Sequence, residues 1–188
     1  MTQSDERIGE PAKPPFNWDK LTAMMAVLIG ACALGVSLYT AFLQRSQVEA
    51  QTWPFLQLWH SNADFSYSLS NRGVGPARIV DAKVWVDDKQ VADFDEAFEK
   101  LSGRKPADLT LNFFSRRVLA ANEDVKMIAF KNQADYDVFQ GNGKRLAFEV
   151  CYCSVLKDCY LLDERAKSEQ AYISPVAACP VGPPGEFR

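Results

Sequence analysis

Four cysteines near the C-terminal end are the residues best suited to chemistry: Cys151, Cys153, Cys159 and Cys179. Thiols grouped in this way can form disulfides, bind a metal ion or exchange electrons with a substrate. Zinc sites favour C-x₂₋₄-C pairs, and redox pairs favour C-x-x-C before a helix, whereas this group opens with C-x-C in a strand-like segment. We therefore predict two structural disulfides, with a zinc site and a redox pair as the alternatives.

Strand register predicts which cysteines pair. If residues 145–153 and 159–163 form a hairpin with Cys153 opposite Cys159, one face of the hairpin is apolar throughout. That face carries Leu146, Phe148, Val150, Tyr152, Tyr160 and Leu162. The register favours a Cys153–Cys159 bridge and leaves Cys151 on the other face, with Cys179 as its partner. The other two connectivities of four cysteines stay open.

No other group of side chains has the composition of a catalytic or cofactor site. His60 is the only histidine, so a two-histidine metal site cannot form, and we expect it on the surface. Neighbouring residues on a strand point to opposite faces, so the adjacent carboxylates at 87–88 and at 163–164 do not form catalytic pairs, and we expect them to be turn and surface charges. Residues 87–90 are expected to form the turn of a short hairpin that ends at Val91. Gly73 and Gly75 resemble part of a phosphate loop, but no G-K-S/T follows, so we expect a turn in which glycine supplies positive φ. The sequence predicts no catalytic residue, no cofactor, no bound metal and no enzyme.

Residues 21–43 contain 23 positions without a charge. A helix of this length is about 35 Å long, enough to cross a hydrocarbon core of about 30 Å. We predict a transmembrane helix at 19–44 followed by a linker at 45–52. The run is too long for a cleaved signal peptide. Residues 29–32 resemble a bacterial lipobox, which leaves a lipidated Cys32 as the alternative.

Basic residues near the span predict its orientation. Arg7, Lys13 and Lys20 precede it, whereas only Arg45 follows closely. The positive-inside rule then puts the N-terminus in the cytoplasm and the C-terminal domain in the periplasm, on a single-pass protein of the inner membrane. Prolines in residues 1–18 predict a disordered tail. An extracytoplasmic domain also suits disulfides.

Small residues in the span are spaced so that two helices could approach closely. Ala26 and Gly30 form one small-x₃-small pair, and Ala31 and Gly35 form another. Such pairs occur at helix–helix contacts in membranes. We therefore predict a homodimer through the membrane helix, with the lipid bilayer as the other partner of this segment.

Alternating apolar residues predict a mainly β domain over residues 53–178, followed by a loose tail at 179–188. Phe65, Tyr67 and Leu69 alternate with serines, which indicates a half-buried strand. Residues 93–101 have helical spacing, with Asp93 as N-cap and Gly103 after the end. A second helical turn is expected at 136–139. Short strands between turn signals favour one antiparallel sandwich with one or two short helices.

Two segments of this domain resemble a known group. Residues 67–77 (YSLSNRGVGPA) and 84–89 (VWVDDK) resemble the early strands of immunoglobulin-like modules in bacterial envelope proteins. Residues 151–155 and 159–160 are similar to the late hairpin of single-pass bacterial membrane proteins. The resemblance implies an immunoglobulin-like β-sandwich and an envelope location, and it implies no catalytic residues.

The sequence leaves two functional classes. The first is a membrane-anchored, non-enzymatic envelope protein that binds a protein partner through exposed strand edges and through Trp53, Phe55 and Trp59. The second is a thiol-redox or hydrolytic envelope enzyme that uses the cysteine group. A net charge of −3 and the lack of a basic cluster beyond residues 116–117 argue against nucleic acid as a partner.

Overall fold

The structure is a computed structural model that describes residues 17–180. The tails expected at 1–18 and 179–188 therefore lie almost wholly outside the described residues. The chain divides into two compact units, one ending at Ser46 and the other beginning at Gln47.

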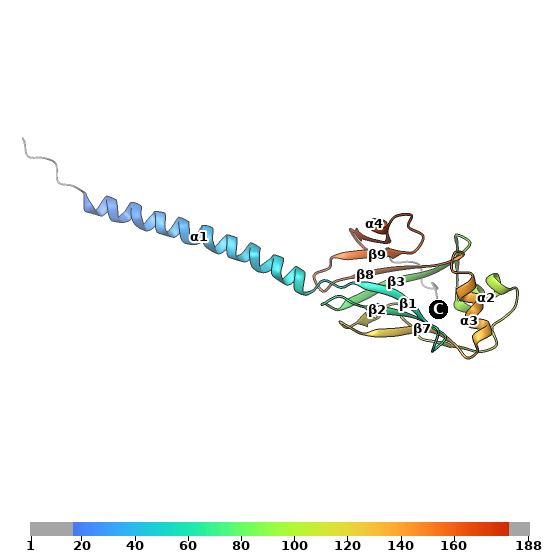
Figure 1. The fold of residues 1–188 in the computed structure, drawn as a ribbon. Helices are drawn as coiled ribbons and strands as arrows, with labels where there is room; N and C mark the ends of the chain where they lie inside the picture. Colours follow the sequence, from blue (N-terminus) through green and yellow to red (C-terminus); the bar gives the residue numbers. More distant parts are fainter. Residues whose placement is uncertain (1–16, 181–188) are drawn as a thin grey trace, which may run out of the picture. The chain divides into compact units, whose positions relative to one another are not determined.

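Helix α1 (Trp18–Gln51) contains the apolar segment and is long and apolar enough to cross a membrane (Figure 1). Its 34 residues correspond to about 50 Å of helix, and none of them is buried. The helix includes all but the last residue of the segment predicted as a linker at 45–52, so most of that segment is helical. Residues 44–51 contain no glycine or proline, and nothing in their sequence ends the helix before Pro54.

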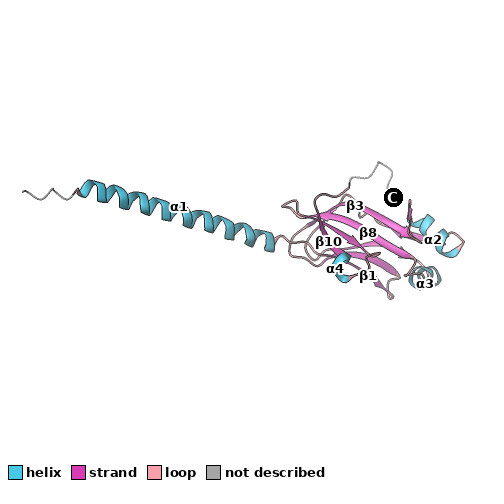
Figure 2. Ribbon diagram, turned by 90° about the horizontal axis from the view of Figure 1, so that it is seen from above, coloured by secondary structure: helices cyan, strands magenta, loops and turns pink. Residues whose placement is uncertain are grey.

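Two antiparallel sheets form the domain that follows (Figures 1 and 2). The first sheet has the order β1 (Leu56–Ser61), β2 (Ser66–Asn71), β7 (Asp124–Phe130), β5 (Leu109–Leu111). The second has the order β10 (Ile173–Val176), β9 (Cys159–Asp163), β8 (Leu146–Cys153), β3 (Ala77–Val86), β4 (Lys89–Val91), and β6 (Val118–Leu119) also pairs with β3. The antiparallel, sheet-rich fold predicted from the turn spacing is confirmed.

One core joins the two sheets. Leu56, Leu69 and Ile128 from the first sheet and Val84 and Val150 from the second are all fully buried within it. Burial of apolar side chains between two sheets is the main favourable contribution to the stability of such a fold.

Helices α2 (Phe94–Ser102) and α3 (Gln133–Gly141) lie together at one end of the sheets, which we call the helical end (Figure 2). Helix α2 is capped as predicted: the Asp93 carboxylate accepts a hydrogen bond from the Glu96 N–H, and Gly103 has φ 72° after the last turn. The turn expected at 136–139 is a helix of nine residues, because Asn132 caps it earlier by accepting from the Asp135 N–H. Helix α4 (Glu169–Tyr172) precedes β10 and was not predicted.

The serines of β2 are not on a solvated face. Ser66, Ser68 and Ser70 are each fully buried, although their alternation with apolar residues predicted a half-buried strand. Trp59 lies opposite Ser68 in the register, and its indole Nε1–H donates to the Ser70 hydroxyl at 2.6 Å. Serine is small enough for the larger side chains of a neighbouring strand to cover it.

The end of the domain opposite the helices, which we call the turn end, contains the loop after β2. Asn71 is fully buried there, and its side chain contacts five backbone groups. Its Oδ1 accepts from the N–H groups of Phe55 and Gly73, and its Nδ2 donates to the carbonyls of Gly75, Leu119 and Ala120. Asn71 therefore joins three segments that are distant in sequence.

Gly73 and Gly75 do form a turn, but not for the reason that the sequence suggested. Among the described glycines, only Gly103 has a positive φ. A Cβ at Gly73 would lie 2.4 Å from the Trp53 carbonyl oxygen, and one at Gly75 would lie 2.1 Å from that of Thr52. These positions require glycine because residues 52–55 pass so close to the loop.

Candidate functional site

The four cysteines form two disulfides on the outer face of the second sheet. Cys153 is bonded to Cys159, and Cys151 is bonded to Cys179, with Cα–Cα distances of 4.0 and 5.6 Å. In the β8–β9 register Cys153 is opposite Cys159, Tyr152 is opposite Tyr160, and Val150 is opposite Leu162. These are the register and the pairs that the apolar pattern of the hairpin predicts.

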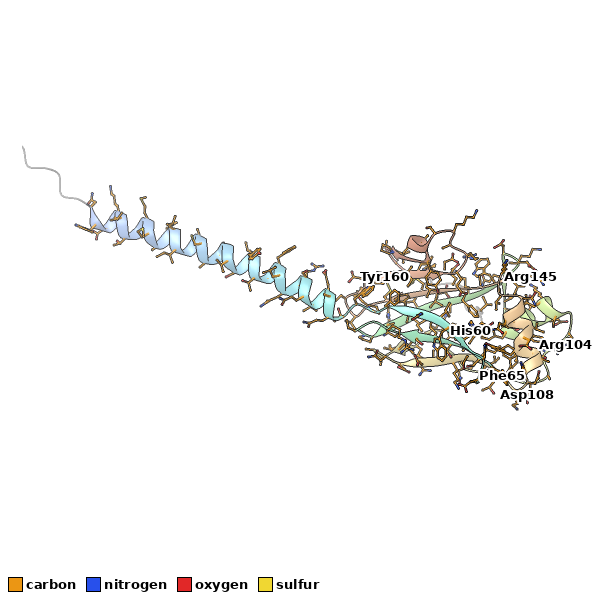
Figure 3. The ribbon with its side chains drawn as sticks, in the orientation of Figure 1. His60, Phe65, Arg104, Asp108, Arg145 and Tyr160 are labelled. Atoms are coloured by element: carbon orange, nitrogen blue, oxygen red, sulfur yellow. A yellow bond between two sulfur atoms is a disulfide. The ribbon has the colours of Figure 1, made fainter. Side chains whose placement is uncertain are left out.

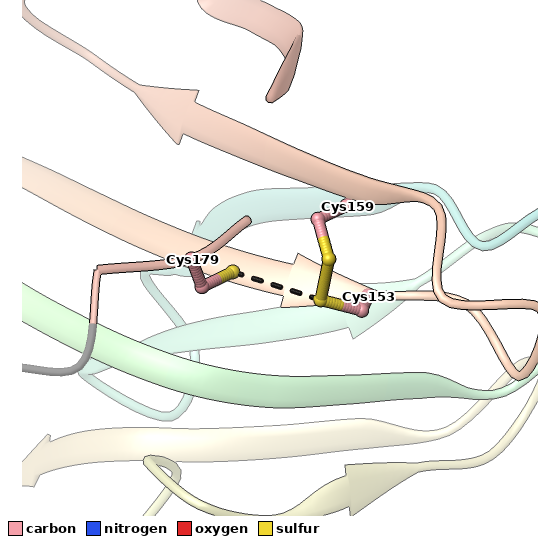
Figure 4. Close-up of side chains that lie close together, drawn as sticks. All are labelled: Cys153, Cys159 and Cys179. Carbon is pink, nitrogen blue, oxygen red and sulfur yellow. Dashed lines mark hydrogen bonds between the residues drawn. A yellow bond between two sulfur atoms is a disulfide. The ribbon is translucent and has the colours of Figure 1, made fainter. Parts of the chain in front are cut away.

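The two disulfides touch each other, and Figure 4 shows Cys179 of one beside the Cys153–Cys159 bridge. The Cys153 and Cys179 sulfurs are 3.7 Å apart although each is bonded to a different partner. Because both sulfurs are oxidised, neither has a proton to donate, and the approach is a contact between two sulfurs. The sulfurs of Cys153, Cys159 and Cys179 all lie within 4.8 Å of one another. In this oxidised state the sulfurs are joined to each other and are not thiolate ligands for a metal.

Charged side chains continue the same outer face toward the helical end. Lys83 lies 3.0 Å from Glu149 and 3.3 Å from Asp81. Arg165 pairs with Glu149 as well, and its guanidinium lies 3.8 Å from the centre of the Trp85 ring. Arg165 also pairs with Asp163, so the two bases of this network are shared among three carboxylates.

A cavity of about 330 Å³ lies at the turn end beside the Cys153–Cys159 bridge. Trp53, Asp158, Cys159 and Tyr160 are among the residues that line it. Tyr160 is labelled at this end of the domain in Figure 3. A disulfide-bonded residue, Cys159, therefore borders a space large enough for a small molecule.

Strand β1 is an edge strand, and half of its backbone groups have no partner strand. The Arg72 N–H donates to the Phe55 carbonyl, which makes these two residues a hydrogen-bonded pair of the β1–β2 ladder. Because such pairs alternate along an antiparallel ladder, Leu58 and His60 direct their N–H and C=O groups away from β2. This is the exposed edge that another strand can pair with.

A cavity of about 210 Å³ opens beside this edge, between β1 and β8. Leu58, Tyr67, Leu146 and Phe148 supply apolar walls, and His60, Gln140 and Glu164 supply polar groups. The His60 and Tyr67 ring centres are 5.7 Å apart. We call this cavity, together with the free edge of β1, the β1 groove. His60 lies exposed in it, as predicted, toward the helical end (Figure 3).

Glu164 is the most unusual group in the β1 groove. Its carboxylate accepts a hydrogen bond from the Phe148 N–H at 2.9 Å, although the residue as a whole stays exposed. Burial of the carboxylate raises the pKa of Glu164, and the neighbouring Asp163 adds to this. No ion pair joins Glu164 to a basic side chain among residues 17–180. It is a partly desolvated carboxylate without a cation.

Two tyrosines respond to the same environment. Burial raises the pKa of Tyr172 to about 12, and the charge of Glu164 adds to that effect. Burial, together with Tyr136 and Glu164, also raises the pKa of Tyr67. Both phenols are therefore neutral over the physiological range and can only donate or accept hydrogen bonds. The β1 groove therefore offers the neutral Tyr67 phenol and the Glu164 carboxylate for hydrogen bonds to a ligand.

A larger cavity of about 690 Å³ adjoins the β1 groove and shares Gly143, Leu146 and Glu164 with it. Its wall includes Trp85 and Arg145, and Figure 3 labels Arg145 at the helical end. The Arg145 guanidinium binds both carboxylate oxygens of Asp87, at 2.6 and 2.7 Å. The two cavities together leave one side of the domain hollowed along the start of β8.

The predicted contact residues lie in different places. Trp53 is 46 % exposed at the turn end, with its ring centre 5.4 Å from that of Phe55. Phe55 and Trp59 are half-buried, and the Trp59 indole is held against Ser70. Of the three, only Trp53 is exposed, so the contact surface expected for these residues is smaller than the sequence implied.

The small residues predicted for helix association lie exposed on α1, namely Ala26, Gly30, Ala31 and Gly35. A Cβ added at Gly30 or at Gly35 would meet nothing within 4 Å. Dimerisation through this helix stays a prediction. Cys32 is also exposed on α1, and it is the one free cysteine of the described residues.

Comparisons with protein-family models, with curated proteins and with solved structures gave no match for this chain.

Proposed function

We propose that this protein is a membrane-anchored, non-enzymatic component of a bacterial envelope, whose β domain binds an extended segment of another envelope protein in the β1 groove. The observation that carries the proposal is the free edge of β1 beside a cavity that holds an unpaired carboxylate. Addition of a strand to a free edge gives affinity through backbone hydrogen bonds, and adjacent pockets give specificity through side chains.

The charge of the groove indicates the kind of segment that fits. Burial disfavours the charged form of the Glu164 side chain, and no basic side chain of the described residues neutralises that charge. A lysine or arginine of the partner would supply the missing cation and form a charge-assisted hydrogen bond. The apolar walls formed by Leu58 and Phe148 would hold the methylene stem of that side chain. The proposed ligand is therefore an extended segment with a basic side chain.

Strand order supports an immunoglobulin-like assignment for the domain. The order β1-β2-β7-β5 facing β9-β8-β3 corresponds to the ABED and CFG sheets of such domains. The disulfides differ, because both lie on the outer face of one sheet and neither joins the two sheets. The long apolar helix α1, the basic residues that precede it and the two disulfides together support an inner-membrane anchor with a periplasmic domain.

The decisive experiment uses a photo-crosslinking amino acid at Gln57, which is exposed on β1. His60→Pro removes an outward N–H without touching the β1–β2 ladder, whereas His60→Ala keeps that N–H. We expect a discrete crosslinked adduct in cells with His60→Ala, its loss with His60→Pro, and a several-fold weaker adduct with Glu164→Gln. An adduct of equal strength with His60→Pro would refute strand addition. A crosslinker at Gln90, on the opposite edge strand β4, is the positional control.

Location has its own test. Protease added to spheroplasts should remove the β domain and leave a membrane-embedded fragment that contains α1. A domain that stays intact until the membrane is lysed would contradict the periplasmic assignment, and it would do so independently of the crosslinking result.

A further inference from the structure

We propose that the four cysteines form a thiol–disulfide exchange relay, in which a small thiol reacts at Cys159 and the released Cys153 thiolate then takes Cys179 from Cys151. This activity is independent of the β1 groove, because the cysteines lie at the turn end and the groove extends toward the helical end.

The short distance between the Cys153 and Cys179 sulfurs favours attack of Cys153 on Cys179 as the second step of the relay. The Cys153 sulfur is 3.7 Å from the Cys179 sulfur, so it needs only a small movement to attack once it is a thiolate. Chain entropy does not oppose the exchange. The bridge that breaks joins residues 28 apart, and the bridge that forms would join residues 26 apart, so the two loops constrain the chain almost equally.

The position of the cavity at the turn end favours attack of the small thiol on Cys159 as the first step. Cys159 lines the cavity of about 330 Å³, although it is only 8 % exposed. Neither Cys151, which is buried, nor Cys179, which is half-buried, lines that cavity. A small thiol in this cavity therefore reaches the Cys159 sulfur first. Asp158 also lines the cavity, and its negative charge disfavours anionic thiols. The fitting reagent is a small neutral or cationic thiol or dithiol.

Bonds and electrons balance at each step. The thiolate of the reagent bonds to Cys159, the Cys153–Cys159 bond breaks, and its electron pair leaves on Cys153. The Cys153 thiolate bonds to Cys179, the Cys151–Cys179 bond breaks, and Cys151 leaves as a thiolate that takes up the proton lost by the reagent. With a dithiol, its second thiol releases Cys159, so the reagent is oxidised to a disulfide and the protein keeps one bridge, Cys153–Cys179.

The direct test is partial reduction of the full chain in detergent with an equimolar amount of dithiothreitol, followed by acid quenching and alkylation. Chymotrypsin cleaves after Tyr152 and so separates Cys151 from Cys153 for non-reducing peptide mapping. We expect most partly reduced molecules to hold a Cys153–Cys179 bridge with alkylated Cys151 and Cys159. Molecules that keep Cys151–Cys179 and carry alkylated Cys153 and Cys159 would overturn the relay.

A matched pair of variants tests the same step without a reductant. Cys159→Ser leaves Cys153 unpaired 3.7 Å from Cys179, whereas Cys153→Ser leaves Cys159 unpaired, and the Cys32 thiol on α1 is free in both. Both lose the same bridge, and thermal unfolding checks that both fold. We expect Cys179 to be shared between Cys151 and Cys153 in Cys159→Ser, and to stay wholly on Cys151 in Cys153→Ser. A single Cys151–Cys179 bridge in both would contradict the proposal.

A third measurement concerns the reagent. Cysteamine, a cationic thiol, should start the exchange several-fold faster than glutathione, an anionic one, at equal thiolate concentration. Equal rates for the two thiols, or faster reaction of glutathione, would contradict attack at Cys159 from the cavity that Asp158 lines.

Discussion

At the turn end of the domain, two disulfides and the five contacts of Asn71 join segments that are far apart in the sequence. At the helical end, distant segments are joined by aromatic packing and by one buried carboxylate. Phe98 stacks on Phe139 there, and Asp135, which is 1 % exposed, pairs with Arg104. Among the described residues, covalent links occur only at the turn end, whereas the helical end relies on packing and hydrogen bonds beside the β1 groove and the larger cavity. The covalent links and the proposed strand-binding groove therefore lie toward opposite ends.

The long disulfide should make the largest single contribution to this difference. Replacing both Cys151 and Cys179 by serine opens a loop of sequence separation 28, which by chain entropy lowers the free energy of unfolding by about 3–4 kcal/mol. Replacing both Cys153 and Cys159 opens a loop of separation 6 and should cost about 2 kcal/mol. Urea unfolding of both variants measures the two costs. A larger loss of stability on removal of the Cys153–Cys159 bridge than on removal of the Cys151–Cys179 bridge would contradict this prediction.

Asn71→Ala should have the next largest effect. It leaves several buried backbone N–H and C=O groups without a partner, which lowers the free energy of unfolding by about 3 kcal/mol. Asn112 also donates to a backbone carbonyl, but at an exposed site, so Asn112→Ala should change stability by less than about 0.5 kcal/mol. The denaturant midpoints of the two variants show whether the burial of Asn71 accounts for its larger contribution to stability.

Asp135→Ala tests the helical end, and we expect a loss of about 2 kcal/mol. Burial would raise the pKa of Asp135, but hydrogen bonds from the Ala107 N–H and from Asn132 and Arg104 outweigh it, so the pKa is lowered. The stabilisation is therefore present above the usual carboxyl pKa and is lost as pH falls through the lowered value. The difference between wild type and variant should shrink from pH 6 to pH 3. Asp137→Ala, exposed on the same helix, is the control.

Glu164→Gln should have the smallest effect and the opposite sign. Because the pKa of Glu164 is raised, the contribution of this group to stability is lost as pH rises through that value. The variant should be about 0.5 kcal/mol more stable than wild type at pH 7, with a smaller difference near pH 4. Denaturation at the two pH values measures this. A variant that is less stable at pH 7 would show that the carboxylate serves the fold and not a ligand.

Local patterns predicted the features that depend on neighbouring residues. The N-cap of α2 at Asp93 and the Cys153–Cys159 register both follow from residues within one short segment. The hairpin turn at 87–88 was also predicted, and Asp87 and Asp88 both have positive φ as a tight turn requires. In each case the signal and the structure it specifies lie within one continuous segment of fewer than about 20 residues.

The β1 groove could not be predicted because its parts come from distant segments. Glu164 was interpreted as a surface charge next to Asp163. The residues around it in the sequence give no sign that Phe148 and Tyr67 lie close to its carboxylate in the fold. Gly73 and Gly75 gave a signal, but their role depends on residues 52–55 passing over them. The burial of the β2 serines likewise depends on Trp59, a residue of another strand.

The two bridges are nested, with Cys153 and Cys159 inside the loop that Cys151 and Cys179 close. During synthesis the inner pair is complete as soon as the β8–β9 hairpin has emerged, whereas the outer bridge must wait for the last residues of β10 and the segment beyond it. Until then Cys151 is a free thiol only two positions from Cys153, so it can also react with Cys159. The order in which the chain is made thus decides which pair is offered first, and it gives the native Cys153–Cys159 pair a head start over every pairing that involves Cys179.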